Sequence, residues 1–258
     1  MTRRLVVKAV NAVAREGLLG TARKAWQYFA ATALYGRRRR RQREELEQED
    51  GFDAKYGTDT SSLVQVGSLD LPEEQRDYAV LYWPSLRRTV ERLLASLAID
   101  HPAFTFVDVG SGKGRVLLMA SLFPFRRIVG VELSEKLHAV AQRNVEIFRP
   151  PERRCGRIDL VLGDAASFSF PEGNLVLYFF DPFDRAVMER VLANLAESLR
   201  QHPREVWVLY LHARCRAVFD ESALFELVSE HRRVGPRYAA IEYDRCVYRH
   251  RKTATAPS

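Results

Sequence analysis

The chain has 258 residues, of which 47% are hydrophobic and 28% are charged, as expected for one globular domain with an extension. It has no apolar run of about 18 residues and no recognisable signal peptide, so we expect no transmembrane segment and a cytoplasmic protein. Its three cysteines, Cys155, Cys215 and Cys246, lack the spacing of a disulfide framework or a zinc site. We therefore expect no metal.

The charge is unevenly distributed along the chain. Residues 1–43 hold 12 of the 40 Lys and Arg residues and one of the 33 acidic residues, which gives them a net charge of +11. The rest of the chain carries −4, so the pI near 9.5 reflects the N-terminal part alone. We expect contact with nucleic acid only through this basic segment.

Residues 1–50 are expected to be a basic helical extension. Within residues 3–35, apolar residues recur at helical spacing and form a stripe in the second half: Ala22, Trp26, Phe29, Ala30, Ala33 and Leu34. The stripe suits packing on the main domain or a partner subunit; the alternative is weak contact with an anionic membrane surface. A basic run at 37–43 and an acidic run at 44–50 then indicate a solvated helix or linker, and a domain boundary near residue 50.

The next segment is rich in Gly, Thr, Ser and Asp. We expect residues 51–74 to be mainly loop with little regular structure, and a candidate lid. Residues 84–98 have apolar residues at helical spacing and predict a helix with Pro84 in its first turn.

The main domain, residues 75–250, has an α/β pattern. Short apolar runs alternate with helical patterns, which predicts βαβ units and a largely parallel sheet. The expected strands are 104–109, 127–132, 158–162, 175–180 and 205–211, with helices near 113–122, 135–147 and 184–200. Two last strands, 224–234 and 238–248, flank Gly235 and Pro236 and should pair antiparallel. Residues 251–258 are expected to be a disordered tail.

The most informative segment is FTFVDVGSGKGRVLLMAS, residues 104–121. A buried strand is predicted to end at Asp108, and three glycines occupy the turn into the next helix: Gly110, Gly112 and Gly114. Without Cβ atoms, they let a ligand lie against the backbone. The dinucleotide fingerprint GxGxxG needs glycine where this chain has Arg115, which disfavours a nicotinamide oxidoreductase.

Acidic residues also follow the next two strands. Glu132 closes the second strand, 24 residues after Asp108, where a ribose would need its hydroxyl groups bound. Asp164 follows the third strand in the sequence LVLGDA.

Four motifs in order, VDVGSGKGR, VGVELS, LVLGDA and FFDPF, resemble the cofactor motifs of class I S-adenosylmethionine-dependent methyltransferases. This resemblance covers about residues 104–184. It implies a Rossmann-like fold, with a seven-stranded mostly parallel sheet, a C-terminal antiparallel strand and helices on both faces. It also implies S-adenosyl-L-methionine as the cofactor. The site residues that it implies are Asp108, Gly110, Ser111, Gly112 and Gly114 at the methionine part, Glu132 at the ribose, and Asp164 and Ala165 at the adenine.

A narrower resemblance concerns DVGSGKGR, GVELS and the upstream YWPS at residues 82–85. These are similar to the non-SET histone-lysine methyltransferase family and its bacterial relatives. In that family a tyrosine-containing loop closes over the methionine end of the cofactor, which implies Tyr82 and Ser85 as cofactor-binding residues and Tyr82 as a catalytic one. The alternative is that YWPS merely begins a helix.

The acceptor is expected at the end of the fourth strand, YFFDPF, because open α/β sheets bind ligands beyond the carboxyl ends of their strands. Asp181 is the candidate catalytic residue, since its carboxylate could orient an amine and the aromatic neighbours could bound a methylammonium group. The alternative is that Asp181 caps the next helix and the aromatic residues are core. His212, after the fifth strand, is a conceivable base, although we favour a structural role for it.

FFDPF departs from the Asp/Asn-Pro-Pro-aromatic motif of enzymes that methylate nucleobase amines, which disfavours base methylation. We therefore expect methyl transfer to nitrogen, with a protein lysine as the favoured acceptor. The alternatives are a small-molecule methyltransferase and a non-catalytic scaffold that binds S-adenosylmethionine.

Overall fold

The computed structural model describes residues 51–62, 64, 84–231 and 244–251. All of them belong to one compact unit, which spans residues 49–234 and 242–258. The predicted basic extension, Tyr82 and residues 252–258 of the predicted tail lie outside the described residues, so these remain predictions. In the described part of the chain, no helix has the length and apolar character needed to cross a membrane.

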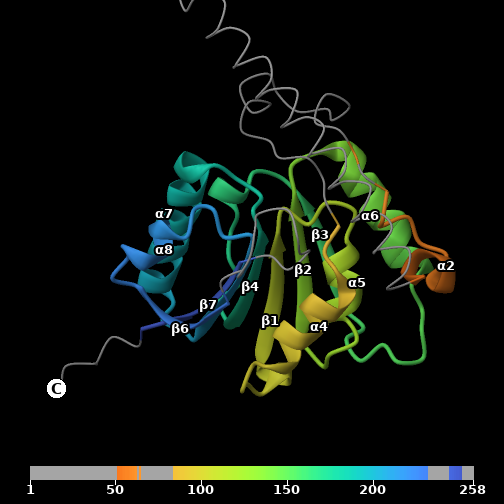
Figure 1. The fold of residues 1–258 in the computed structure, drawn as a ribbon, viewed down its shortest axis with the longest axis horizontal. Helices are drawn as coiled ribbons and strands as arrows, with labels where there is room; N and C mark the ends of the chain where they lie inside the picture. Colours follow the sequence, from red (N-terminus) through yellow and green to blue (C-terminus); the bar gives the residue numbers. More distant parts are fainter. Residues whose placement is uncertain (1–50, 63, 65–83, 232–243, 252–258) are drawn as a thin grey trace, which may run out of the picture. The chain divides into compact units, whose positions relative to one another are not determined.

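Seven strands form one sheet in the order β3-β2-β1-β4-β5-β7-β6 (Figure 1). The strands are β1 Phe104–Val109, β2 Arg127–Glu132, β3 Ile158–Leu162, β4 Asn174–Phe180, β5 Val206–Leu211, β6 Phe225–His231 and β7 Arg245–His250. The first five pair in parallel, and β7 runs antiparallel to both β5 and β6. This confirms the predicted fold class. The strand order reverses between β1 and β4, which is where open α/β sheets place their ligands.

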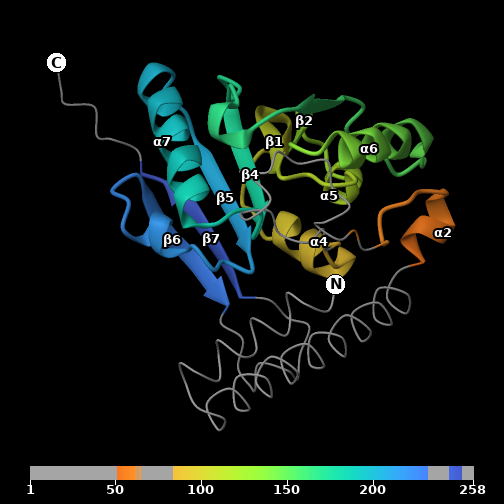
Figure 2. The ribbon, with the colours of Figure 1, turned by 90° about the horizontal axis from the view of Figure 1, so that it is seen from above.

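Helices cover both faces of the sheet (Figures 1 and 2). One face carries α4 (Arg87–Ala95), α5 (Arg115–Ala120) and α6 (Glu135–Ile147); the other carries α7 (Arg185–Gln201) and α8 (Ala217–Asp220). Three short elements complete the described chain: α2 (Phe52–Tyr56), η2 (His101–Ala103) and η3 (Ala165–Ser167).

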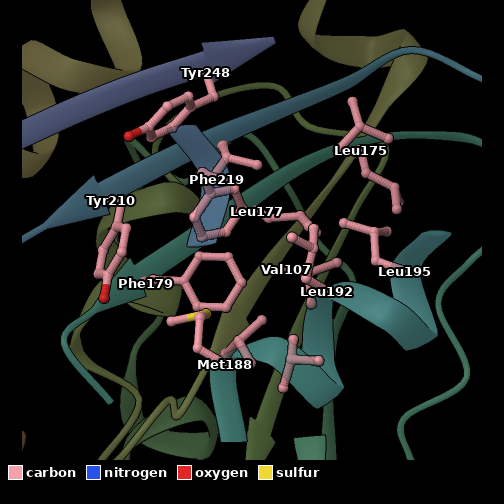
Figure 3. Packing of buried hydrophobic residues seen from close by; sticks show 14 of the residues in the cluster. Val107, Leu175, Leu177, Phe179, Met188, Leu192, Leu195, Tyr210, Phe219 and Tyr248 are labelled. Carbon is pink, nitrogen blue, oxygen red and sulfur yellow. The ribbon is translucent and has the colours of Figure 1, made fainter. Parts of the chain in front are cut away.

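The central strands are continuous apolar runs because both of their faces are covered. Alternate side chains therefore enter two separate cores. Phe106, Ile128 and Leu209 pack with α4 and α5, whereas Val107, Leu177 and Val208 pack with α7. At the α8 end of the second core, Phe179, Tyr210 and Phe219 form an aromatic cluster with centroids 5.8–6.0 Å apart (Figure 3).

Several predicted boundaries differ from the structure, and three of the differences have a clear place in the fold. The loop predicted from residue 51 contains α2, because Phe52 is buried against Phe148 at a ring-centroid distance of 5.8 Å. Helix α4 begins at Arg87, since Leu86 before it is extended with φ −69° and ψ 130°, so Pro84 precedes the helix. Strand β7 begins at Arg245, seven residues later than predicted.

Candidate active site

The glycine-rich turn between β1 and α5 has the backbone conformation for which glycine is suited. Gly110, Gly112 and Gly114 have φ values of 84°, 56° and 82°, in the left-handed region that side chains disfavour. A Cβ atom on Gly110 would lie 2.8 Å from the Cβ of Pro182, in the loop after β4. The loops after β1 and β4 are thus in contact at the switch point of the sheet.

Glu132, at the end of β2, is bound to this turn. Its Oε2 accepts a hydrogen bond of 2.7 Å from the backbone N–H of Gly112, and its Oε1 accepts one of 2.9 Å from Ser134. The side chain is thereby held against the glycine-rich turn, and its role at a ribose remains a prediction.

Asp108, at the end of β1, is a second buried carboxyl group beside Glu132. Burial raises the pKa of Asp108 well above its ordinary value, and the negative charge of Glu132 raises it further. A cationic ligand would relieve this repulsion. Ser111 in the same turn has a buried hydroxyl oxygen with no hydrogen-bond partner in the described part of the chain.

Asp164 and Ala165 lie together after β3. Asp164 caps η3, with its Oδ1 accepting a hydrogen bond of 2.9 Å from the backbone N–H of Ala166, and Ala165 is buried. Asp164 also lines a cavity of about 470 Å³ along β2 and β3, with Val129, Val131 and Phe168 in its wall. The cavity extends to Arg127 at the start of β2 and so runs away from the carboxyl ends of the strands.

Two basic residues of the GSGKGR motif bind a loop that precedes the sheet, which the sequence analysis missed. The side chain of Lys113 is only 4% exposed, and its Nζ lies 2.9 Å from Asp59 Oδ1. Asn144 of α6 ties the two segments together, because its Nδ2 donates to the carbonyl oxygens of both Asp59 and Lys113, each at 2.9 Å.

Arg115 is buried and makes a similar connection. Its Nη1 donates to Thr60 Oγ1 at 2.7 Å, and its Nε donates to the carbonyl oxygen of Ser85 at 2.9 Å. Ser85 in turn shares a hydrogen bond of 2.9 Å between its hydroxyl group and that of Tyr178. The role of Ser85 at the cofactor remains a prediction, and its hydroxyl group is already held by Tyr178.

Asp53 organises the loop that Lys113 and Arg115 bind. Its carboxylate accepts hydrogen bonds from the hydroxyl groups of Thr58 and Thr60 and from the backbone N–H groups of Thr60 and Ser61, at 2.6–2.8 Å. Burial opposes ionisation of Asp53, but these hydrogen bonds outweigh it and hold its pKa below the ordinary value.

The predicted acceptor residues at the end of β4 form two groups, which are the buried aromatic side chains and the carboxylate of Asp181. Tyr178 and Phe179 are fully buried in the two cores, as the alternative interpretation held. The capping part of that interpretation was wrong, because Asp184 caps α7 by accepting a hydrogen bond of 3.0 Å from the N–H of Val187. Asp181 is buried and contacts His212 and Arg214 instead.

The sequence matches a family model. Residues 106–202 match the model described as a methyltransferase domain, and this range contains the glycine-rich turn, Glu132, Asp164 and Asp181. This part of the chain is therefore similar to a methyltransferase domain. Its residues fit S-adenosylmethionine as a cofactor, because the turn admits close approach of a ligand, Glu132 is held against that turn, and the paired carboxyl groups suit a cation.

Several solved structures are similar to the chain at low identity. A protein of the NADB-Rossmann superfamily from Streptococcus agalactiae is 16% identical, with 68% of this chain and 72% of that chain covered and a TM-score of 0.45. A methyltransferase from Escherichia coli is 17% identical, with coverages of 65% and 86% and a TM-score of 0.47. An RNA methyltransferase from Salinibacter ruber, complexed with S-adenosyl-L-homocysteine, is 19% identical, with coverages of 64% and 91% and a TM-score of 0.40. No curated protein matches the chain.

Proposed function

We propose that this enzyme methylates a nitrogen nucleophile, and that its acceptor is a lysine side chain of a protein. The observation that carries the proposal is Asp181, a carboxylate with a side chain only 4% exposed, directly before the proline that contacts the cofactor turn. Its Oδ1 is buried without a hydrogen-bond partner in the described residues, so it keeps the capacity to accept an N–H group.

The residues of the chain would divide the work as follows. Glu132 and the glycine-rich turn hold the cofactor, which supplies a methyl group already activated on a sulfonium. Asp181 orients the acceptor amine by accepting its hydrogens, so that the nitrogen lone pair points at the methyl carbon. Little covalent chemistry is then asked of the protein, because positioning and local charge supply the rate enhancement.

Charge supports a protein acceptor over nucleic acid. Residues 44–258 carry a net charge of −4, which suits a basic lysine-containing segment and opposes a polyanion. Contact with nucleic acid or a membrane surface would depend on the basic N-terminal segment. The resemblance to histone-lysine methyltransferases also favours a protein acceptor. Part of that resemblance is Tyr82, which lies outside the described residues.

The proposal is tested in two steps with the full chain. Calorimetric titration should show binding of S-adenosylmethionine and no binding of a nicotinamide dinucleotide. Cell extract is then treated with enzyme and methyl-labelled cofactor, and the label is sorted with protease, nuclease and a size cut-off. Label in protein, released on hydrolysis as methyllysine, supports the proposal.

Other outcomes would contradict it. Label in small molecules would indicate a small-molecule methyltransferase, and label in nucleic acid would overturn the argument from charge. Binding of the cofactor without any transfer would favour a non-catalytic scaffold that binds S-adenosylmethionine.

We propose the cytoplasm as the compartment of the protein, and microscopy of the tagged chain would test that.

A further inference from the structure

Asp181 and His212 are the residues that directly follow two neighbouring strands, β4 and β5. Phe180 of β4 pairs with Leu211 of β5, so the residues that follow these two are adjacent at the carboxyl edge of the sheet. Asp181 and His212 have φ values of 44° and 49°, and they are the only non-glycine residues with positive φ in the described part of the chain. Such strained conformations persist where the surrounding structure enforces them, and they gather at functional sites.

The two side chains are in contact. His212 Nδ1 lies 3.1 Å from Asp181 Oδ2, and Arg214 Nε binds the same oxygen. The side chain of Asp181 is 4% exposed, whereas that of His212 is 36% exposed. A buried carboxylate therefore lies within ion-pair distance of a partly exposed imidazole.

We propose that His212 is the general base for the methyl acceptor and that Asp181 positions it. The proposal rests on the methyltransferase function proposed above and adds a catalytic residue to it. With a proton on Nδ1 donated to Asp181, the basic lone pair of the imidazole lies on Nε2. A Cβ atom on Gly110 would lie 2.8 Å from the Cβ of Pro182, the residue after Asp181, so this pair follows a loop that lies against the glycine-rich turn.

The step is balanced in protons and electrons. A lysine ammonium gives one proton to Nε2 of His212, and the resulting imidazolium is stabilised by the Asp181 carboxylate. The acceptor nitrogen then forms the N–C bond as the sulfur–carbon bond breaks, and the bonding pair stays on sulfur to give a neutral thioether. His212 releases its proton to solvent, to which it is partly exposed.

Charged and titratable residues neighbour His212 in three segments. They are Asp181 after β4, Arg214 and Cys215 in the loop of His212 itself, and Asp244 and Arg245 where the chain enters β7. The backbone N–H of His212 donates to the carbonyl oxygen of Asp244 at 2.7 Å, which fixes the backbone beside β7. Among the described contacts, the Asp181 carboxylate lies 3.1 Å from the ring nitrogen Nδ1 of His212.

The first experiment tests the pair without any acceptor. The imidazole nitrogen signals of His212, assigned by their loss in His212→Asn, are compared by NMR at one pH in the parent and in Asp181→Asn. Asparagine adopts left-handed backbone conformations readily, so both variants should keep the fold. We expect the Nδ1 signal of His212 to move in Asp181→Asn, because the carboxylate oxygen that lies 3.1 Å from it is lost. An unchanged Nδ1 signal would overturn the pairing.

The second experiment tests the base. His212→Asn keeps a side-chain N–H that can donate to Asp181 but has no basic nitrogen. With a lysine-rich peptide as the probe, we expect about 100-fold slower transfer near pH 7. Cofactor affinity should stay within about twofold of the parent. His202→Asn, at the exposed end of α7, is the matched control and should leave transfer unchanged.

The outcomes separate the two proposals. Transfer by His212→Asn at the parental rate overturns the base role, whatever the NMR result. If the parent binds the cofactor but methylates neither the peptide nor protein, the lysine proposal fails, and the NMR comparison alone decides whether Asp181 and His212 form a pair. If the parent does not bind the cofactor, the assignment of this site as a methyltransferase centre fails.

Discussion

Arg115 donates a hydrogen bond of 2.9 Å from its Nε to the backbone oxygen of Ser85. The same guanidinium group binds Thr60 at 2.7 Å, so one buried side chain at the start of α5 holds two segments that lie 25 residues apart in the sequence. Arginine suits this position because its planar fork offers several donors in fixed directions. Arg115, the residue after Gly114, therefore fixes two segments that precede the sheet in the sequence.

Arg115→Ala should lower the free energy of unfolding by about 2–4 kcal/mol, because it leaves buried acceptors without donors and opens a cavity. Arg115→Lys should recover only part of this loss, since one ammonium cannot reach both segments in the same geometry. Urea denaturation measures both variants. Arg92→Ala, on the exposed side of α4, is the control and should stay within about 0.5 kcal/mol. Equal stability of Arg115→Ala and the parent would show that these bonds contribute nothing.

Asp108→Asn should raise the Tm of the protein at neutral pH and weaken the binding of S-adenosylmethionine. The pKa of Asp108 is raised in the folded state by burial and by Glu132, so the folded protein favours the protonated carboxyl group. This contribution to stability is complete below the unfolded pKa of 3.8 and is lost as pH rises through the folded pKa. Asparagine does not ionise, and a gain of about 2 °C in Tm at pH 7 is expected.

Thermal unfolding from pH 4 to pH 8 checks this, since the parent should fall below the variant as pH rises. Parallel curves would contradict the raised pKa. Calorimetry of the same variant should show weaker binding of S-adenosylmethionine.

Glu132→Ala should weaken S-adenosylmethionine binding by about 10- to 100-fold, because charge-assisted hydrogen bonds to hydroxyl groups are lost. The fold should remain, since the strand core around β2 is unchanged. Calorimetry gives the affinity and circular dichroism the fold. Glu135→Gln, exposed in the first turn of α6, should bind like the parent. If both variants bind with parental affinity, the ribose site lies elsewhere.

Gly110→Ala should destabilise the protein and the cofactor site together. The added Cβ meets Pro182 at 2.8 Å, and the φ of 84° is unfavourable for alanine. We expect a loss of about 1–3 kcal/mol in unfolding experiments and at least tenfold weaker cofactor binding. Gly156→Ala has open space around its added Cβ and is the control. A Gly110→Ala protein with parental stability would mean that the loops after β1 and β4 can move apart without a loss in the free energy of unfolding.

Asp181→Asn should leave cofactor affinity within about twofold and slow methyl transfer by about 100-fold. The amide keeps the shape of the carboxylate but has one oxygen acceptor, so it cannot hold both His212 and Arg214 and still orient an amine. Single-turnover transfer to the lysine-rich peptide measures the effect. Parental transfer would remove Asp181 from the mechanism.

The sequence by itself determined the parallel core and the cofactor motifs. Strands β1, β2 and β3 and helix α6 have the predicted bounds, because continuous apolar runs and helical spacing are local signals that burial on both faces makes strong. The glycine spacing of residues 110–114 identified a turn that needs left-handed backbone. The roles of Glu132 and Asp164, predicted from their order along the chain, remain predictions.

Only the tertiary structure decided which polar side chains meet. The bonds from Arg115 to Thr60 and from Lys113 to Asp59 join residues more than 50 positions apart, and no local pattern encodes such a pair. The contact between Asp181 and His212 likewise arises because β4 and β5 are neighbours in register, which brings the residues after them together. Local periodicity thus predicts which elements form, whereas the pairing of strands determines which residues at their ends can act together.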